Sequence, residues 1–169
     1  MLVELPAYKV RPAGDGIPDK WMTGTQNHEG IVGAAAAVDF LASLASGPRD
    51  RTRRESLHAT YEALHARGEV LLAKMWNSLA AIDGLTLYGP QPGTPRSPTL
   101  SFTLKGKTTD EVAIALAKRG VFVSNGDFYA ATVVERLGVL PHGLVRVGCS
   151  CYTSEQEVER LIDGVGSLV

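Results

Sequence analysis

The hydrophobic pattern of this 169-residue chain changes its period at Asp83-Gly84, and this change limits the folds that the chain can adopt. Before this point, apolar residues recur every three or four positions, which is typical of amphipathic helices. Beyond it, shorter runs alternate between apolar and polar residues, as in Leu100, Phe102 and Leu104, which indicates strands. The chain is therefore expected to place helices first and a small sheet with further helices second.

Two helices are expected in the first part. The first should begin at Asn27, a good N-cap, and end at Ser46-Gly47-Pro48. The second should run from about Pro48 to Ile82, with Gly68 as a place where it could bend. Residues 1–22 contain prolines and glycines that break any periodic element, so they are expected to form an irregular arm that lies on something else.

The second part alternates short strands with helices. The expected strands lie near residues 85–87, 99–104, 121–123 and 144–147, and the expected helices at 108–120, at 130–137 and after the capping residue Ser154. This order predicts an α+β fold, in which a small, mainly antiparallel sheet of about four strands has helices packed on one face. The two helices and the irregular arm precede it.

Charge, hydropathy and cysteine content exclude several classes of function. The formal net charge is −1, so neither a basic field for nucleic acid nor an acidic tail is indicated. No apolar run approaches the roughly 20 residues of a membrane span, and Met1–Leu5 does not open a signal peptide. The two cysteines, Cys149 and Cys151, are awkwardly close for a disulfide, which favours a reduced, cytoplasmic protein.

The turn Gly24-Thr25-Gln26-Asn27 is the first candidate site. It places a hydroxyl and backbone N–H groups at the start of a helix, where the unpaired donors and the helix dipole favour an anion such as phosphate. Gly24 would let the backbone approach such a group closely. An ordinary N-cap turn explains the same residues, and the local pattern leaves both interpretations open.

Arg146 is the second candidate, because it interrupts the short apolar strand Leu144–Val147. Strand alternation puts Leu144 and Arg146 on one face and Val145 and Val147 on the other. The planar guanidinium group suits a carboxylate held through two hydrogen bonds. A structural salt bridge or a position on an edge strand would also explain an arginine here, so the alternatives stay open.

These two segments together resemble class V aminotransferases, and in particular the cysteine desulfurase-like branch of that family. Residues 21–29, Trp-Met-Thr-Gly-Thr-Gln-Asn-His-Glu, resemble the family's Gly-Thr-(Pro/Gln)-Asn stretch, which is followed by a helix rich in glycine and alanine. Val145–Gly148, followed by Tyr152-Thr153, resembles its late Val-Arg segment. The order of elements between the two segments also matches, so the resemblance covers essentially the whole chain.

The resemblance implies a role for each segment in an enzyme that uses pyridoxal phosphate and forms a homodimer. Contacts with the cofactor phosphate, across the dimer, map to Thr25, Gly24 and Gln26. Contacts with an amino-acid substrate map to Arg146 for the α-carboxylate and to Asn27 and His28 at the mouth of the site. Residues 1–22 would end the large cofactor domain, 23–47 would form the phosphate-contact turn and an interdomain helix, and 48–169 would form the small C-terminal domain.

Two departures from the family pattern limit what the chain is expected to do alone. The family's Schiff-base lysine lies in a Ser-x-x-Lys-type segment, and neither Lys9 nor Lys20 has that context. The chain is therefore expected neither to turn over substrate nor to bind pyridoxal phosphate by itself. The loop 124–129 also lacks the nucleophilic cysteine of desulfurases, which favours a lyase or a transaminase role for the parent enzyme. Cys149 and Cys151 are interpreted as small buried hydrophobic residues and not as a zinc site.

Two further hypotheses remain from the sequence alone. The chain could be a non-catalytic α+β domain that binds an amino acid or another carboxylate through Arg146. It could instead be a dimerisation module, because residues 33–37, Gly-Ala-Ala-Ala-Ala, give the first helix a thin face that another backbone could approach. A monomer in light scattering at high concentration would argue against the second of these hypotheses.

Overall fold

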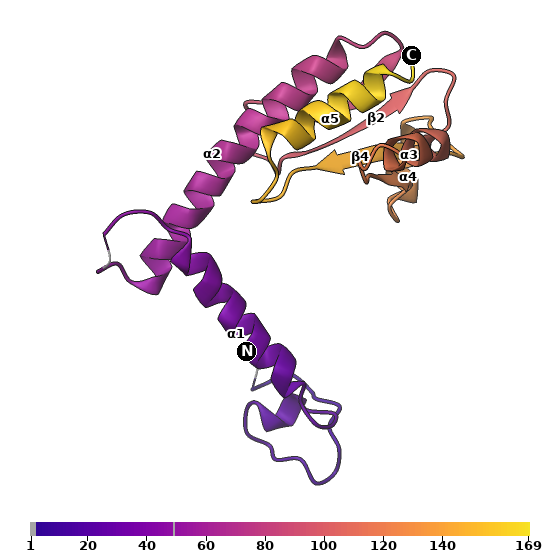
Figure 1. Cartoon of the computed structure of the whole chain (residues 1–169). Coiled ribbons are helices and arrows are strands. Elements are labelled where there is room, and N and C mark those ends of the chain that lie inside the picture. Colours follow the sequence, from indigo (N-terminus) through magenta and orange to yellow (C-terminus); the bar gives the residue numbers. More distant parts are fainter. Residues whose placement is uncertain (1–2, 49) are drawn as a thin grey trace. The chain divides into compact units, whose positions relative to one another are not determined.

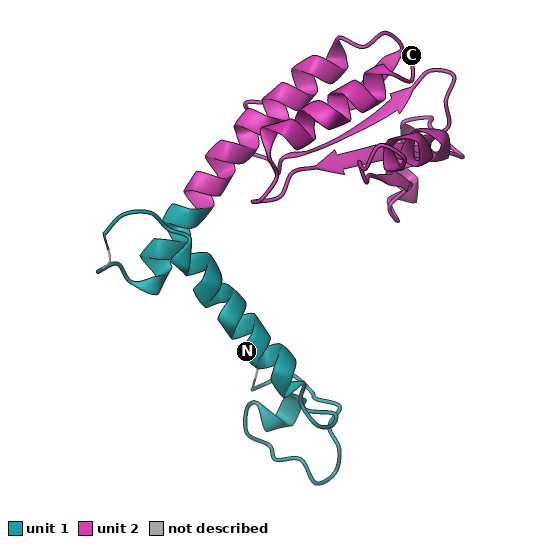
Figure 2. Cartoon of the chain, in the orientation of Figure 1, with its two compact units in different colours: residues 1–60 teal, residues 61–169 magenta. Residues whose placement is uncertain are grey.

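The computed structural model describes residues 3–48 and 50–169 (Figure 1). Its contacts group into two compact units, Met1–Thr60 and Tyr61–Val169 (Figure 2). Helix α2, Arg53–Ala80, runs through the boundary between them. Residues 1 and 2, which open the expected arm, lie outside the described residues. The boundaries at residues 22 and 47, which concern domains of a parent enzyme, stay predictions.

Unit 1 begins with turns and contains helix α1, His28–Ser43. The described part of the arm has one short 3₁₀ helix, η1 (Asp19–Trp21). Asn27 caps α1, because its side-chain oxygen accepts a hydrogen bond from the N–H of Gly30 at 2.8 Å. The predicted start of this helix is therefore confirmed, whereas its end at Ser43 comes before the predicted Ser46-Gly47-Pro48.

Helix α2 begins at Arg53 and not near Pro48, because a pair of hydrogen bonds fixes its first turn. The N–H of Thr52 donates to Oε2 of Glu55 at 2.8 Å, and the N–H of Glu55 donates to Oγ1 of Thr52 at 3.3 Å. This reciprocal capping satisfies two backbone donors that the helix itself leaves unpaired. Gly68, where a bend was considered, is a point of close approach, since a Cβ there would lie 3.1 Å from the ring of Pro98.

Unit 2 contains a four-stranded antiparallel sheet with the strand order β1-β2-β4-β3. The strands are β1 (Leu85–Tyr88), β2 (Thr99–Leu104), β3 (Ser124–Gly126) and β4 (Leu144–Gly148). The remaining helices are α3 (Thr109–Ala117), α4 (Ala131–Arg136) and α5 (Glu155–Gly166). This arrangement confirms the predicted α+β class and its small antiparallel sheet.

The third strand lies later in the chain than the sequence predicted. Val121–Val123 alternates as a strand would, and Val121 and Val123 do pack against the core while Phe122 is 86% exposed. However, the hydrogen-bonded partner of β4 is the next segment, in which Ser124 pairs with Arg146 and Gly126 with Leu144. The prediction of a strand at 121–123 was therefore wrong, because the ladder depends on the partner strand and not on local alternation.

The hydrophobic core of unit 2 lies between one face of the sheet and helices α2, α3 and α5. On β2, buried Leu100, Phe102 and Leu104 alternate with half-buried threonine and serine residues, as the period-2 pattern predicted. Helix α2 contributes Leu71, Leu72, Met75 and Leu79. No helix in the described ranges is both long and apolar enough to cross a bilayer.

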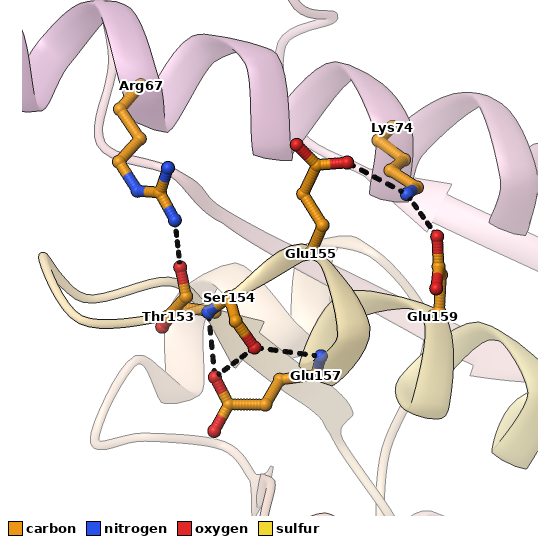
Figure 3. Close-up of polar contacts among 7 residues, drawn as sticks. All are labelled: Arg67, Lys74, Thr153, Ser154, Glu155, Glu157 and Glu159. Carbon is orange, nitrogen blue, oxygen red and sulfur yellow. Dashed lines mark hydrogen bonds and ion pairs between the residues drawn. The ribbon is translucent and has the colours of Figure 1, made fainter.

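Polar contacts fasten α5 to α2 outside this core (Figure 3). Lys74 of α2 contacts Glu159 at 2.6 Å and Glu155 at 3.4 Å, and these contacts raise the pKa of its amine. The start of α5 is fixed by a capping box, in which the N–H of Ser154 donates to the Glu157 carboxylate and the N–H of Glu157 donates to Oγ of Ser154. The hydroxyl of Ser154 also contacts this carboxylate. These bonds lower the pKa of Glu157.

Candidate functional site

Arg146 lies in a row of polar residues on the face of the sheet opposite the core. Its neighbours in β4, Val145 and Val147, are buried in the core, whereas Arg146 is exposed. The register pairs Arg146 with Ser101 of β2 on one side and with Ser124 of β3 on the other. Because directly paired residues point to the same face, Arg146 is flanked by two hydroxyl-bearing residues. The predicted division of β4 into two faces is confirmed.

Arg146 has no anionic partner among the residues that the structure describes. Within those residues, its guanidinium group makes a single cation–π contact, with the ring of Phe128. Strand β4 also lies inside the sheet, between β2 and β3, and not at an edge. Neither a salt bridge within residues 3–48 and 50–169 nor an edge-strand position therefore explains this arginine. The N–H groups of this guanidinium can therefore donate hydrogen bonds to an external anion.

Phe128 stacks on this guanidinium group, with its ring centroid 4.2 Å from Cζ of Arg146. Phe128 and Tyr129 both have a left-handed backbone, with φ of 56° and 58°. Such a conformation costs a residue with a side chain about 1–3 kcal/mol, so it persists only where the surroundings impose it. Asp127 supports this turn, because its Oδ1 accepts from the N–H of Tyr129 at 3.0 Å and its carbonyl oxygen from the N–H of Ala130 at 2.8 Å.

A shallow cleft of about 510 Å³ opens beside Arg146. Its walls include Thr99 and Ser124, whose hydroxyl groups can donate or accept hydrogen bonds, and the exposed ring of Phe122. Ser97 also lines the cleft, and this combination of one cation, three hydroxyl groups and an aromatic wall suits a small zwitterion or carboxylate better than a purely apolar ligand. Neither Phe122 nor Phe128 was predicted to lie beside Arg146, because the residues that surround Arg146 depend on the pairing of strands that are distant in the sequence.

The predicted phosphate-contact turn lies in unit 1, at the start of α1. Asn27 acts as the N-cap, so the local N-cap interpretation is confirmed. Within the described part of the chain, the hydroxyl of the exposed Thr25 has no partner, and a Cβ at Gly24 would meet nothing within 4 Å. The carbonyl oxygen of Gln26 accepts from the N–H of His28 at 3.0 Å. Since Arg146 belongs to unit 2, the roles of Thr25, Gln26 and His28 in one shared site stay predictions.

Both lysines of the arm are held by neighbouring groups. The ammonium group of Lys9 donates to the carbonyl oxygens of Ala13 (2.8 Å) and Gly14 (3.2 Å) and to Oδ1 of Asp15 (2.5 Å). These bonds use all three of its donors, and the hydrogen bond from Lys9 lowers the pKa of Asp15. Lys20 donates to the carbonyl oxygen of Val3. Each amine is thus hydrogen-bonded to groups of the arm itself.

The two cysteines differ from each other. Cys149 is half-buried with its Sγ 3.9 Å from Sδ of Met75, and burial raises the pKa of its thiol. It therefore fits the predicted role of a small hydrophobic residue. Cys151 is exposed, so the same prediction was wrong for this residue, which follows the end of β4. In the described part of the chain, no group of His, Cys, Asp or Glu residues could hold a metal ion.

Residues 8–161 match the family model described as Aminotransferase class-V. The chain belongs to the class V aminotransferase family. Among the curated relatives of this class V chain, a probable cysteine desulfurase from Vibrio cholerae is 29% identical over 154 residues, which are 91% of this chain and 33% of the relative. A cysteine desulfurase from Pectobacterium atrosepticum is 30% identical over 148 residues, or 88% of this chain and 31% of that protein.

Solved structures show the same fold. The class V chain aligns with an apo cysteine desulfurase from Thermococcus onnurineus at a TM-score of 0.73 and 24% identity, over 90% of its own length and 34% of that chain. The cysteine desulfurase CsdA from Escherichia coli aligns at a TM-score of 0.69 and 23% identity, over 89% of this chain and 32% of CsdA. The chain thus spans about a third of the length of the relatives that it matches.

Proposed function

We propose that this chain serves as the small domain of a pyridoxal-phosphate-dependent class V enzyme, and that Arg146 holds the α-carboxylate of its amino-acid substrate. The observation that carries the proposal is the unpaired guanidinium group of Arg146 in the polar row beside an open cleft. A planar cation of this kind binds a carboxylate through two parallel hydrogen bonds. Ser124 and Thr99 stand beside it and can receive the ammonium group or the side chain of the same ligand.

The residues of this chain suit the phosphate group of pyridoxal phosphate but not the formation of an imine with it. Thr25, with Gly24 and Gln26, offers a hydroxyl and open backbone that fit a phosphate contact, whereas Lys9 and Lys20 are engaged elsewhere. Pyridoxal phosphate, when bound, supplies the electron sink for chemistry at the substrate Cα. Because neither Lys9 nor Lys20 stands in the family's Ser-x-x-Lys context, we propose that the contribution of this chain is to bind and orient the substrate, and that it is not active alone.

The reaction class that we propose for the complete enzyme is that of a lyase or transaminase. The turn after β3 runs through Asp127, Phe128 and Tyr129, and it contains no thiol that could attack a substrate sulfur atom. The chain also has two free thiols and no disulfide among its described residues, which supports a reduced compartment such as the cytoplasm. An assembly as a homodimer is part of the same proposal.

The carboxylate role predicts that the isolated chain binds a small amino acid weakly and through the carboxylate. We expect L-alanine to bind with a Kd on the order of 1–10 mM, because one charge-assisted pair at an open site contributes only a few kcal/mol. The measurement is a titration of the ¹⁵N-labelled chain followed by NMR, with shifts centred on β4 and β3. L-alaninamide, which lacks the carboxylate, is the control. Equal binding of the amide, or no binding of L-alanine, would contradict the proposal.

The sequence context of Lys9 and Lys20, which is not of the Ser-x-x-Lys type, predicts that the chain forms no specific imine with pyridoxal phosphate. After incubation and borohydride reduction, mass spectrometry should find partial modification spread over several lysines. The pattern should be the same in Lys9→Arg and Lys20→Arg variants, apart from the replaced residue, since we propose that neither lysine is the specific Schiff-base residue. A one-to-one adduct at a single lysine, lost in one of these variants, would show that the chain holds the cofactor ring after all.

A further inference from the structure

We infer that Phe128 is the residue that positions Arg146 for its ligand: the ring fixes the plane of the guanidinium group and leaves its N–H edge to the carboxylate. The inference rests on the proposed role of Arg146 and adds to it a contact with a residue of the loop 124–129. It starts from the ring centroid of Phe128, which lies 4.2 Å from Cζ of Arg146. An arginine on an exposed sheet face would otherwise sample many rotamers, and ordering it would reduce its affinity for a ligand.

The geometry of stacking is compatible with carboxylate binding. An aromatic ring contacts the face of a guanidinium group, whereas a carboxylate hydrogen-bonds to N–H groups at its edge, in the plane. The two contacts therefore use different parts of Arg146 and can exist together. Among the described residues, no carbonyl or carboxylate group occupies that edge. The ring supplies the orientation that in other sites a carboxylate neighbour provides, without neutralising the charge that the ligand needs.

The chain holds Phe128 in place by an unusual backbone. Phe128 has φ of 56°, in the left-handed region that residues with side chains rarely adopt. Asp127 accepts two backbone hydrogen bonds across this turn, from Tyr129 and Ala130. The turn follows directly after β3, which is paired with β4 beside Arg146. Strand pairing and the hydrogen bonds of Asp127 thus place the Phe128 ring over the guanidinium group. The unfavourable φ belongs to the same residue that makes this contact.

Phe128 does not block the cleft. The cleft beside Arg146 is lined by Arg146, Ser124 and Phe122, among others, and Phe128 is not among its walls. The ring therefore stacks on Arg146 from outside the space that a ligand would occupy. This placement distinguishes a positioning residue from a plug, which would have to leave before the ligand could enter. The two roles predict opposite effects of removing the ring.

The test compares Phe128→Leu with the wild-type chain by NMR, using the Nε–Hε signal of Arg146, which an Arg146→Lys variant identifies. Without ligand, the wild-type signal should carry the ring-current shift of a stacked proton, and Phe128→Leu should lose it. On titration with L-alanine, Phe128→Leu should bind about three- to tenfold more weakly, since it loses the cation–π contact and the ordering of the side chain. Phe128→Tyr keeps the ring and should stay within about twofold of the wild type.

Tyr129→Leu is the matched control, because Tyr129 shares the left-handed backbone of the same turn and its side chain is fully exposed. It should keep both the ring-current shift and the affinity. The inference is overturned if Phe128→Leu binds as well as or better than the wild type, if the wild-type signal has no ring-current shift, or if Phe128→Tyr is as weak as Phe128→Leu. Failure of the wild-type chain to bind L-alanine would overturn the role of Arg146 itself, which separates the two proposals.

Discussion

Replacing Gly143 with alanine is expected to lower the free energy of unfolding by about 3 kcal/mol or more, one of the larger effects of a single substitution in this chain. Gly143 precedes β4 and has φ of +70°, where an L side chain is strained. An added Cβ would also overlap the carbonyl group of Gly126, the last residue of β3. Because both groups belong to the backbone, relief requires the two strands to move apart.

Gly138 provides a matched control for this substitution. Its φ of +69° is nearly the same as that of Gly143, yet a Cβ at this position would meet nothing within 4 Å. Gly138→Ala therefore measures the cost of the left-handed conformation alone, about 1 kcal/mol. The difference between the two variants in urea denaturation reports the backbone overlap. Equal losses of stability would show that β3 and β4 do not approach each other as closely as the structure indicates.

Features that depend on neighbouring residues in the chain could be predicted from the sequence. Asn27 caps α1 and Ser154 caps α5, as predicted, because an N-cap binds N–H groups two or three positions ahead. The two faces of β4 were also predictable, since alternation alone puts Arg146 opposite Val145 and Val147. The start of α2 lies at Arg53 and not near Pro48, where a proline suited to a first turn predicted it. Thr52 and Glu55, three residues apart, carry the sequence pattern of a capping box.

Features that depend on distant segments could not be predicted in this way. The strand at 121–123 was placed wrongly because the register of β3 is set by its pairing with β4 and by the close contact of Gly126 with Gly143. The contact between Phe128 and Arg146 requires a left-handed phenylalanine, which local preferences disfavour. For Arg146 itself, the sequence could indicate the type of ligand. Only the contacts in the structure show that, among the described residues, no carboxylate pairs with it.

Arg146→Ala is expected to weaken the binding of L-alanine by about 10- to 100-fold, the range that follows from the loss of a charge-assisted pair of hydrogen bonds. Arg146→Lys should lie between this variant and the wild type. Lysine keeps the positive charge but offers neither the planar pair of donors nor the flat face on which Phe128 stacks. The fold should be unaffected, because the Arg146 side chain is exposed and makes no hydrogen bond or ion pair within the described residues, while its backbone pairing in the sheet does not depend on the side chain.

Arg136, an exposed arginine in the last turn of α4, is the control that separates a specific contact from a general effect of charge. Arg136→Ala changes the net charge by the same amount as Arg146→Ala but leaves the row of β2, β3 and β4 intact. In NMR titrations, Arg136→Ala should bind L-alanine with the same affinity as the wild type, both at low and at high salt. If Arg146→Ala bound L-alanine as the wild type does, the cation at the centre of the sheet would not be the carboxylate-binding group. The unpaired guanidinium group would then be expected to contact another protein surface instead of a small ligand.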